Sequence, residues 1–343
     1  MRTETAVLLL IGLAAMVQPG ATPLTAAQQA AVGRISENML ASRYAVARAM
    51  ADSAMATPGA DPIFPMLKLM IVGLREMDFE TVIDSGEFEA TADAVLEELD
   101  SLEAQEENLA YARTIRGFVL ATRAAYDLRR DRHMRAVRGG LDALRMLEEA
   151  AQGDSTIADA DYFLGLYDWS RSDLRRRLWW VLFWLPGNRE RGVSRLERCR
   201  REGLFCPIAA AISLVEVYAR SGKFERAREL LDTLLMRFPH SRFVLWAEVK
   251  YYLEREEHRE AAKVYAKLAE SYGKERYGAY NAAFCGLQGA TLLYESDDVA
   301  GAAAACRKLL SRREEGDDSR VADIRDDARE LLERTERDGT GGS

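Results

Sequence analysis

The chain has 343 residues, of which 48% are hydrophobic and 30% are charged, and its formal net charge is -8 at pH 7. This length and composition allow an extensive buried core, and the acidic balance argues against general nucleic-acid binding, which needs a basic face to neutralise phosphate groups. Long β-branched runs are missing and the few prolines lie mostly between predicted helices, so an all-α chain is expected.

The N-terminal segment, residues 1–21, has the layout of a secretory signal peptide. Arg2 precedes an apolar run from Ala6 to Val17, and a Pro-Gly-Ala sequence ending at Ala21 follows it. The run is too short to span a bilayer comfortably, and no other segment is long enough to do so. We expect cleavage after Ala21 or near Ala27 and an exported, periplasmic or envelope-associated protein. An uncleaved anchor and a misassigned start are the alternatives.

Residues 22–157 are expected to form divergent helical hairpins. Pro58 to Pro62 ends the first pair of helices, and Gly117 with Ala143 permits close packing in the last pair. The predicted helices lie at Ala26 to Met55 (two helices), Ile63 to Met77, Phe88 to Leu102, Leu109 to Leu128 and Arg132 to Ala150.

Residues 158–206 form an aromatic and arginine-rich helical segment. Ten arginines and three acidic residues lie between Arg171 and Arg201, around the apolar run from Leu178 to Leu185. One interpretation is a surface that contacts anionic lipid or an acidic partner. Its candidate contact residues are Arg175, Arg176, Arg177, Trp179 and Trp180. The other interpretation is a buried helix whose tryptophans fill the solenoid while the arginines reach outward.

The segment from Pro207 to Pro239 has the spacing of a helix, a turn, a second helix and a stop, with a period of about 34 residues. Gly222 supplies the turn, Ala227 is small where the two helices approach closely, and Pro239 prevents continuation of the second helix. The residues that fit the spacing are Leu214, Tyr218, Gly222, Phe224, Ala227, Leu231 and Pro239. This segment resembles a tetratricopeptide (TPR) repeat.

The pattern recurs after the central repeat. One period further along the chain, Tyr252, Ala261 and Tyr265 keep the register, and Tyr280 to Leu310 forms a more degenerate copy. Residues 207–310 are therefore predicted as TPR repeats and residues 311–336 as a capping helix, with a disordered tail at 337–343. The predicted fold is an all-α, TPR-like solenoid of antiparallel helical hairpins that ends in this C-terminal cap.

A wider resemblance extends over roughly Ile63 to Leu268. The sequences ADYFLGLYDW and LPGNRERG, followed by the central repeat, look like those of exported bacterial TPR proteins distantly similar to the eukaryotic TTC39/Iml2 group. The resemblance implies a repeat scaffold and adds little about an activity.

The first helices of stacked TPR hairpins line a concave groove. By analogy with TPR proteins, the residues expected to face it are Ile212, Glu216, Arg220, Phe243, Trp246, Lys250 and Glu254. This mixture suits an extended or helical peptide with apolar anchors. It lacks the paired Lys and Asn residues of the TPR carboxylate clamp. For Trp246, packing between repeats is an equally good interpretation.

The four cysteines fall into two pairs along the chain. Cys199 and Cys206 flank a tight connection, and Cys285 and Cys306 lie on the two helices of the last hairpin. An oxidising compartment would favour bridging in both pairs, and buried free thiols are the alternative.

No catalytic, metal-binding or cofactor-binding motif is found. The three histidines lie on different predicted hairpins, and there is no HExxH pair, Walker loop, dinucleotide fingerprint or GxSxG elbow. We therefore predict a non-enzymatic TPR scaffold for protein–protein interaction in the bacterial envelope, with a protein or peptide partner and no cofactor. A peripheral membrane protein that docks through residues 171–201 is the alternative, and an enzyme whose site is assembled by the fold is a third reading.

Overall fold

The computed structural model describes residues 23–83, 86–104, 108–153, 158–177, 188–312 and 319–340. Every regular element within these ranges is an α-helix. The helices are α1 (Ala26–Leu40), α2 (Tyr44–Met55), α3 (Ile63–Phe79), α4 (Glu87–Ala104), α5 (Leu109–Leu128), α6 (His133–Gly153), α7 (Ala160–Arg177), α9 (Arg189–Glu202), α10 (Pro207–Ala219), α11 (Phe224–Arg237), α12 (Arg242–Glu254), α13 (His258–Tyr272), α14 (Ala279–Glu295), α15 (Val299–Ser311) and α16 (Ser319–Thr340).

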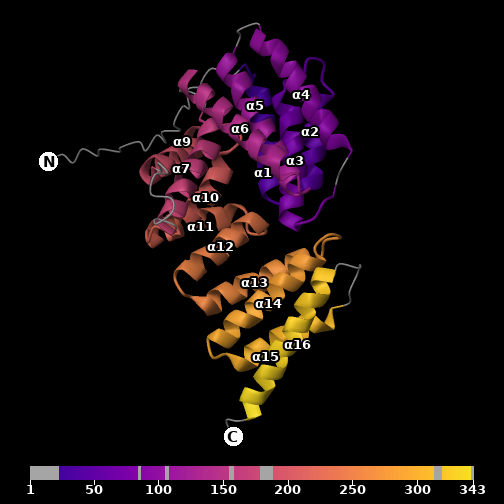
Figure 1. Ribbon diagram of the computed structural model, residues 1–343, viewed down its shortest axis with the longest axis vertical. Helices are drawn as coiled ribbons and strands as arrows, with labels where there is room; N and C mark the ends of the chain where they lie inside the picture. Colours follow the sequence, from indigo (N-terminus) through magenta and orange to yellow (C-terminus); the bar gives the residue numbers. More distant parts are fainter. Residues whose placement is uncertain are drawn as a thin grey trace, which may run out of the picture.

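The helices pack as a solenoid of hairpins (Figure 1). Each first helix packs on the second helix of its own hairpin, as in α5 with α6 and α10 with α11, and several also pack on the first helix of the next hairpin, as in α3 with α5 and α10 with α12. Helix α16 covers α14 and α15 at the C-terminal end. The predicted TPR-like solenoid with a capping helix is therefore confirmed.

One backbone turn recurs in five hairpins. In each, the residue two positions before the second helix has a positive φ, and the N–H of the following residue donates to the carbonyl five residues earlier, at 2.8 to 3.0 Å. This pairing is a Schellman-type helix end. The residues with positive φ are Ser42, Asp131, Gly222, Glu256 and Asp297. The hairpins α1–α2 and α5–α6 thus share the turn of the central repeat, although their sequences have diverged.

Close packing of the hairpins depends on small residues. Ala227 is fully buried between α10 and α11, as its place in the repeat predicts. In the α5–α6 hairpin, a Cβ atom added to Gly117 would lie 2.5 Å from Cγ of Leu147. That separation is shorter than any ordinary van der Waals contact, so the predicted role of Gly117 in close packing is confirmed.

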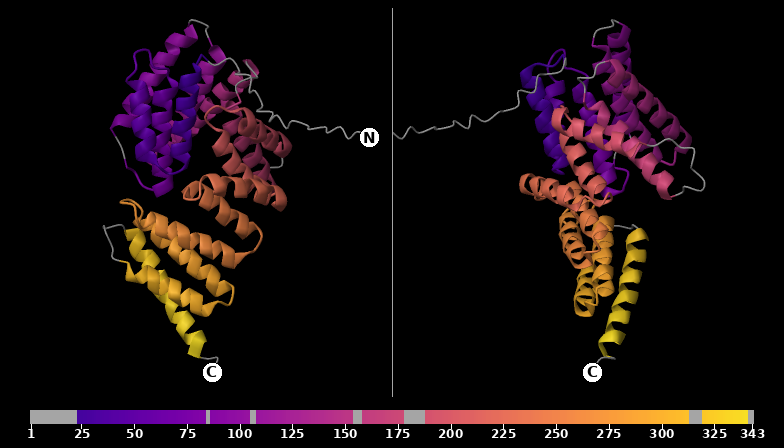
Figure 2. Two further views of the ribbon diagram at one scale, coloured as in Figure 1. Left: turned by 180° about the vertical axis from the view of Figure 1, so that it is seen from behind. Right: turned by 90° about the vertical axis from the view of Figure 1, so that its left-hand side faces the viewer.

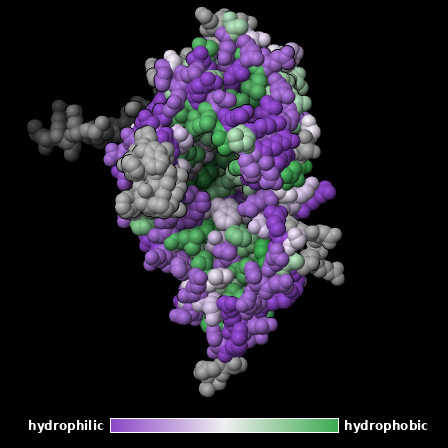
Figure 3. Space-filling model, in the orientation of Figure 1, coloured by the Kyte–Doolittle hydropathy of each residue, from purple (hydrophilic) through white to green (hydrophobic). Residues whose placement is uncertain are grey.

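The N-terminal helices fold back onto the repeats (Figure 2). Helix α1 packs on α10, and Ser241, just before α12, donates a hydrogen bond of 2.5 Å from its Oγ to the carbonyl of Leu40. Figure 3 shows a hollow with apolar residues in the middle of this face, between the N-terminal helices and the repeats. The chain thus closes a turn of the superhelix.

The C-terminal end of the chain differs in part from the predicted boundary. Helix α16 continues to Thr340, so the disorder predicted from Arg337 begins too early. Asp338 accepts a hydrogen bond of 2.7 Å from the hydroxyl of Tyr294, which ties this last turn to α14. The predicted signal peptide lies outside the described residues. Ala27 is inside α1, whose capping box is formed by Thr25, so cleavage after Ala21 leaves the helix intact and cleavage near Ala27 does not.

Candidate functional site

A buried ion pair joins the N-terminal helices to the repeats. Nη2 of Arg242, at the start of α12, lies 2.6 Å from Oδ2 of Asp78, near the end of α3, although the two residues are 164 positions apart. The hydroxyls of Tyr44 and Tyr272 donate to the two oxygens of Asp78 at 2.7 and 2.8 Å. We call these four residues the hub. All four are buried, so the hub fixes the N-terminal helices against α12 and α13.

The hub arginine is held among aromatic rings. Its guanidinium carbon lies 4.9 Å from the ring centre of Phe79 and 5.1 Å from that of Tyr272. Burial by itself would lower the pKa of Arg242, but the hydrogen bonds and charge of Asp78 outweigh it and raise that pKa. Burial and the neighbouring Asp78 also raise the pKa of Tyr44 well above its ordinary value. The guanidinium therefore stays charged and the phenol stays a donor.

A cleft of about 560 Å³ opens beside the hub, between α2, α3 and the connection from α13 to α14. Figure 1 shows this connection near the ends of α2 and α3 that face the repeats. We call it the junction cleft. Tyr44 of the hub contributes to its wall, together with Phe79 and Tyr277. The cleft therefore adjoins the contact between the N-terminal helices and the repeats.

The junction cleft carries more positive than negative charge. Four arginines line it, and Glu275 is its one acidic residue. Arg48 pairs with Glu87, and Glu275 pairs with Arg242 at 3.4 Å. The other three arginines form no ion pair or hydrogen bond with any side chain that the structure describes. They are Arg43, Arg75 and Arg276.

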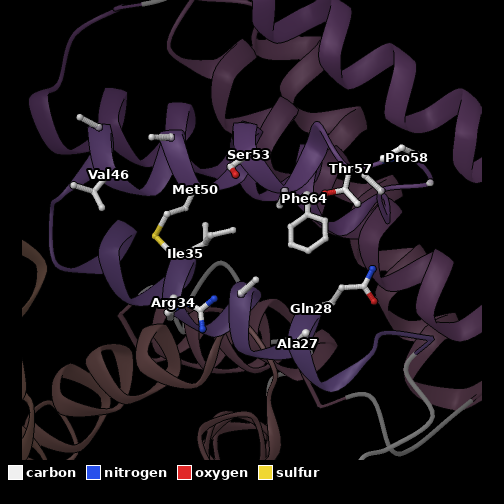
Figure 4. A pocket seen from close by; sticks show the side chains of 16 residues that line it. Ala27, Gln28, Arg34, Ile35, Val46, Met50, Ser53, Thr57, Pro58 and Phe64 are labelled. Carbon is white, nitrogen blue, oxygen red and sulfur yellow. The ribbon is translucent and has the colours of Figure 1, made fainter.

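A second concavity is an open groove of about 830 Å³ between α1 and α2. Figure 4 shows the side chains of Ile35, Met50 and Phe64 in the space between these helices. Alanines such as Ala27 and Ala49 form its walls, and Gln28 lies among its polar lining residues. We call it the end groove, because α1 and α2 form the first hairpin of the array.

The two ends of the solenoid are covered differently. At the C-terminal end, Ile324 and Ala328 of α16 bury the apolar face of the last hairpin, in contact with Phe284. At the N-terminal end, no helix of the described residues packs on the outer side of the α1–α2 hairpin. The end groove is the apolar surface that a further helix would cover.

The charged side chains predicted to line the concave groove form ion pairs with one another. Glu216 of α10 accepts a hydrogen bond of 2.6 Å from Nζ of Lys250 on α12 and lies 3.5 Å from Arg220. Arg220 in turn lies 3.6 Å from Glu254. Ile212 and Phe243 are half-buried against the core. The seven residues are brought to neighbouring first helices as expected, but their charges neutralise one another.

Trp246 has contacts that favour its packing role. Its Nε1 donates to the hydroxyl of Tyr272 at 2.9 Å. Its ring lies edge-on to Tyr265, with centroids 5.7 Å apart, and 6.5 Å from Phe284 of the next repeat. The side chain therefore bridges α12 to α13 and α14.

Several arginines of the arginine-rich segment form ion pairs with buried carboxylates of the protein itself. Arg191 and Arg195 of α9 reach the buried carboxylate of Asp168 on α7, at 2.6 and 3.1 Å. Arg198 lies 2.7 Å from the buried Asp161. These pairs hold α9 against α7. Of the predicted surface contacts, the side chains of Arg175, Arg176 and Arg177 and all of Trp179 and Trp180 lie outside what the structure describes.

All four cysteines are buried and free in this structure. Burial raises the pKa of each thiol. The nearby carboxylate of Asp159 raises the pKa values of Cys199 and Cys206 further. Such thiols are poor nucleophiles. Cys285 and Cys306 lie on the adjacent helices α14 and α15, as predicted.

Within the described residues, no group of three or more His, Cys, Asp or Glu side chains is arranged to hold a metal ion. None of the helices searched there has the length and apolar character needed to cross a membrane.

Comparison with known proteins gives little beyond the fold. No family model matches the sequence, and no curated protein matches it. The crystal structure of yeast Tom70 is similar at a TM-score of 0.38 and 9% identity, over 90% of this chain and 82% of that chain. The fold assignment therefore depends on the helix packing and the repeated turn described above.

Sequence reasoning missed both the hub and the junction cleft. Asp78 ends an apolar helix and Arg242 follows the Pro239 that closes the central repeat, and each is a charged residue that the helix pattern alone places at a helix end. Their burial was not visible, because no pattern in the sequence connects positions so far apart.

Proposed function

We propose that this protein is a non-enzymatic scaffold that binds another protein in the bacterial envelope, and that the end groove receives an amphipathic helix of the partner. The apolar face of the α1–α2 hairpin, on which no helix of the described residues packs, supports this proposal most directly. Repeat arrays need their terminal apolar faces covered, and α16 covers the other end. A groove between two helices, with apolar floor and polar rim, is the surface that an amphipathic helix fits. The envelope location is supported by the apolar run from Ala6 to Val17.

A single substitution on the wall of the end groove tests the proposal. Ala49 is exposed on α2 and lines the groove, so Ala49→Glu places a carboxylate where an apolar helix would lie. Ala125, exposed on α5, provides a control in which the same change is made away from the groove. The wild-type mature protein is expected to recover a stoichiometric partner from an envelope extract.

Ala125→Glu should retain that partner, and Ala49→Glu should lose at least about tenfold in affinity while its circular dichroism stays unchanged. Equal binding by both variants would remove the end groove from the proposal. Substrate turnover by the purified protein would contradict the non-enzymatic part.

A further inference from the structure

We infer that the junction cleft binds an acidic segment of a protein, one that carries an apolar side chain between its carboxylates. Ala49, which is substituted to test the end groove, does not line the junction cleft. Either proposal can therefore be refuted without the other.

The first reason is charge. Arg43 and Arg276 are exposed at the rim of the cleft, directly before α2 and on the α13–α14 connection, and Arg75 is half-buried on α3. None of these guanidinium groups has an ion-pair partner among the described side chains. The protein as a whole has a net charge of -8, so three unpaired arginines around one cleft give it a local sign opposite to that of the molecule.

The second reason is the apolar surface between these arginines. Phe79 and Ile71 are buried beneath the cleft. The guanidinium carbons of Arg75 and Arg276 lie 5.4 and 5.3 Å from the ring centre of Tyr277. Arginine and tyrosine around an apolar centre are typical of protein interfaces. Contact with the Tyr277 ring restrains the two guanidinium groups. Binding a carboxylate therefore costs these side chains little conformational entropy.

The third reason is the shape of the cleft. Its volume of about 560 Å³ is within the range of binding pockets, and two of its arginines, Arg43 and Arg276, stand exposed at the rim on separate segments of the chain. A small anion bound there would keep much of its hydration water and would contact few of the arginines at once. A peptide that lies across the cleft can place separate carboxylates on separate arginines, with an apolar side chain over Phe79.

Two acidic side chains in or beside the cleft already have partners among the described residues. Glu275 is occupied by Arg242 of the hub, and Glu87 is shared by Arg48 and Lys68. Both walls belong to parts of the chain that the hub joins, so a bound peptide would touch α2 and α3 on one side and the repeats on the other.

The test uses a fluorescein-labelled peptide of sequence Glu-Glu-Leu-Glu-Glu-Leu-Glu-Glu and fluorescence anisotropy with the whole mature protein. The Arg43→Gln/Arg276→Gln double variant removes two rim charges that form no ion pair with a described side chain. The matched control is Arg129→Gln/Arg138→Gln. Arg129 directly follows α5, Arg138 lies on α6, and neither has an ion pair among the described side chains. The two double variants change the net charge by the same amount.

Wild type and control should bind saturably, the double variant should bind at least about tenfold more weakly, and a peptide with Gln in place of Glu should not bind. Binding should also weaken as sodium chloride is raised. Equal affinity of the two double variants would overturn the inference. Displacement of the peptide by inorganic phosphate at comparable concentration would overturn it in favour of a small-anion site. If the wild-type and control proteins bound phosphatidylglycerol vesicles while the Arg43→Gln/Arg276→Gln variant did not, that result would overturn the inference in favour of a membrane contact.

Discussion

Replacing Asp78 with Ala should separate the N-terminal helices from the repeats. The change leaves the guanidinium of Arg242 buried without a carboxylate, and it removes the acceptor of the Tyr44 and Tyr272 hydroxyls. Breaking a buried ion pair by removing one partner typically costs about 3–5 kcal/mol. The hydroxyls left without an acceptor act in the same direction, since an unsatisfied buried donor costs about 1–3 kcal/mol.

Urea unfolding followed by circular dichroism measures this loss. The wild-type protein should unfold with the N-terminal helices and the repeats coupled, because the hub and the α1–α10 contact join them. In Asp78→Ala the repeats can remain folded after the N-terminal helices have come away, so the transition should broaden or split. A double variant, Asp78→Leu/Arg242→Met, should recover part of the loss because no uncompensated charge remains.

The control is Glu37→Ala, which removes an ion pair with Arg237 at the same contact between the N-terminal helices and the repeats. Both side chains of that pair are exposed, so its loss should cost less than about 1 kcal/mol. If Asp78→Ala cost no more than Glu37→Ala, the hub would not be what holds the two parts together.

Four further predictions concern the turns, one carboxylate, one tryptophan and the thiols. Gly222→Ala should cost about 1–2 kcal/mol, and Glu256→Gly should gain up to about 1 kcal/mol, in urea unfolding, because both positions have positive φ. Burial raises the pKa of Glu248, so the folded state binds a proton that the unfolded state has lost, and stability falls as pH rises through that window. Relative to Glu248→Gln, wild type should therefore lose free energy of unfolding as the pH rises above about 4.3, the ordinary pKa of a glutamate. Trp246→Ala should destabilise by on the order of 3 kcal/mol, and a loss of partner binding without destabilisation would instead assign it to the groove. Iodoacetamide should modify the four cysteines only after unfolding, as read by mass spectrometry, since burial raises each thiol pKa.

The sequence was informative wherever structure is local. The helix predicted at Leu109 to Leu128 has those bounds, and the last repeat predicted from Tyr280 to Leu310 corresponds to α14 and α15. Apolar periodicity and turn residues act over a few positions, so they can be read directly from the chain.

The repeated turn shows where local reading becomes incomplete. Only Gly222 marks it by residue type, whereas Ser42, Asp131, Glu256 and Asp297 adopt the same left-handed conformation without being glycine. Hydrogen bonding across the end of each first helix imposes that conformation. The divergent N-terminal hairpins could therefore be predicted as helical pairs, and only the backbone reveals that two of them share the turn of the repeats.

Contacts between distant positions could not be predicted at all. The hub depends on Asp78 and Arg242 meeting after the superhelix has closed, and the junction cleft depends in turn on that closure. Helix patterns assign both residues to helix ends, where charged residues are ordinarily solvated. Their burial is a property of the whole array.

The asymmetry between the two ends of the array links the proposed sites. At the C-terminal end the capping helix α16 is supplied by the chain itself, so that end is closed to further stacking. At the other end the first hairpin has an apolar groove on which no described helix packs. It also borders an electropositive cleft where it meets the repeats, and α2 lines both. A partner with one amphipathic helix and an acidic segment could therefore occupy both sites around α2. The double variant Arg43→Gln/Arg276→Gln and the single variant Ala49→Glu would then weaken the same complex, whereas two unrelated partners would each respond to only one of them.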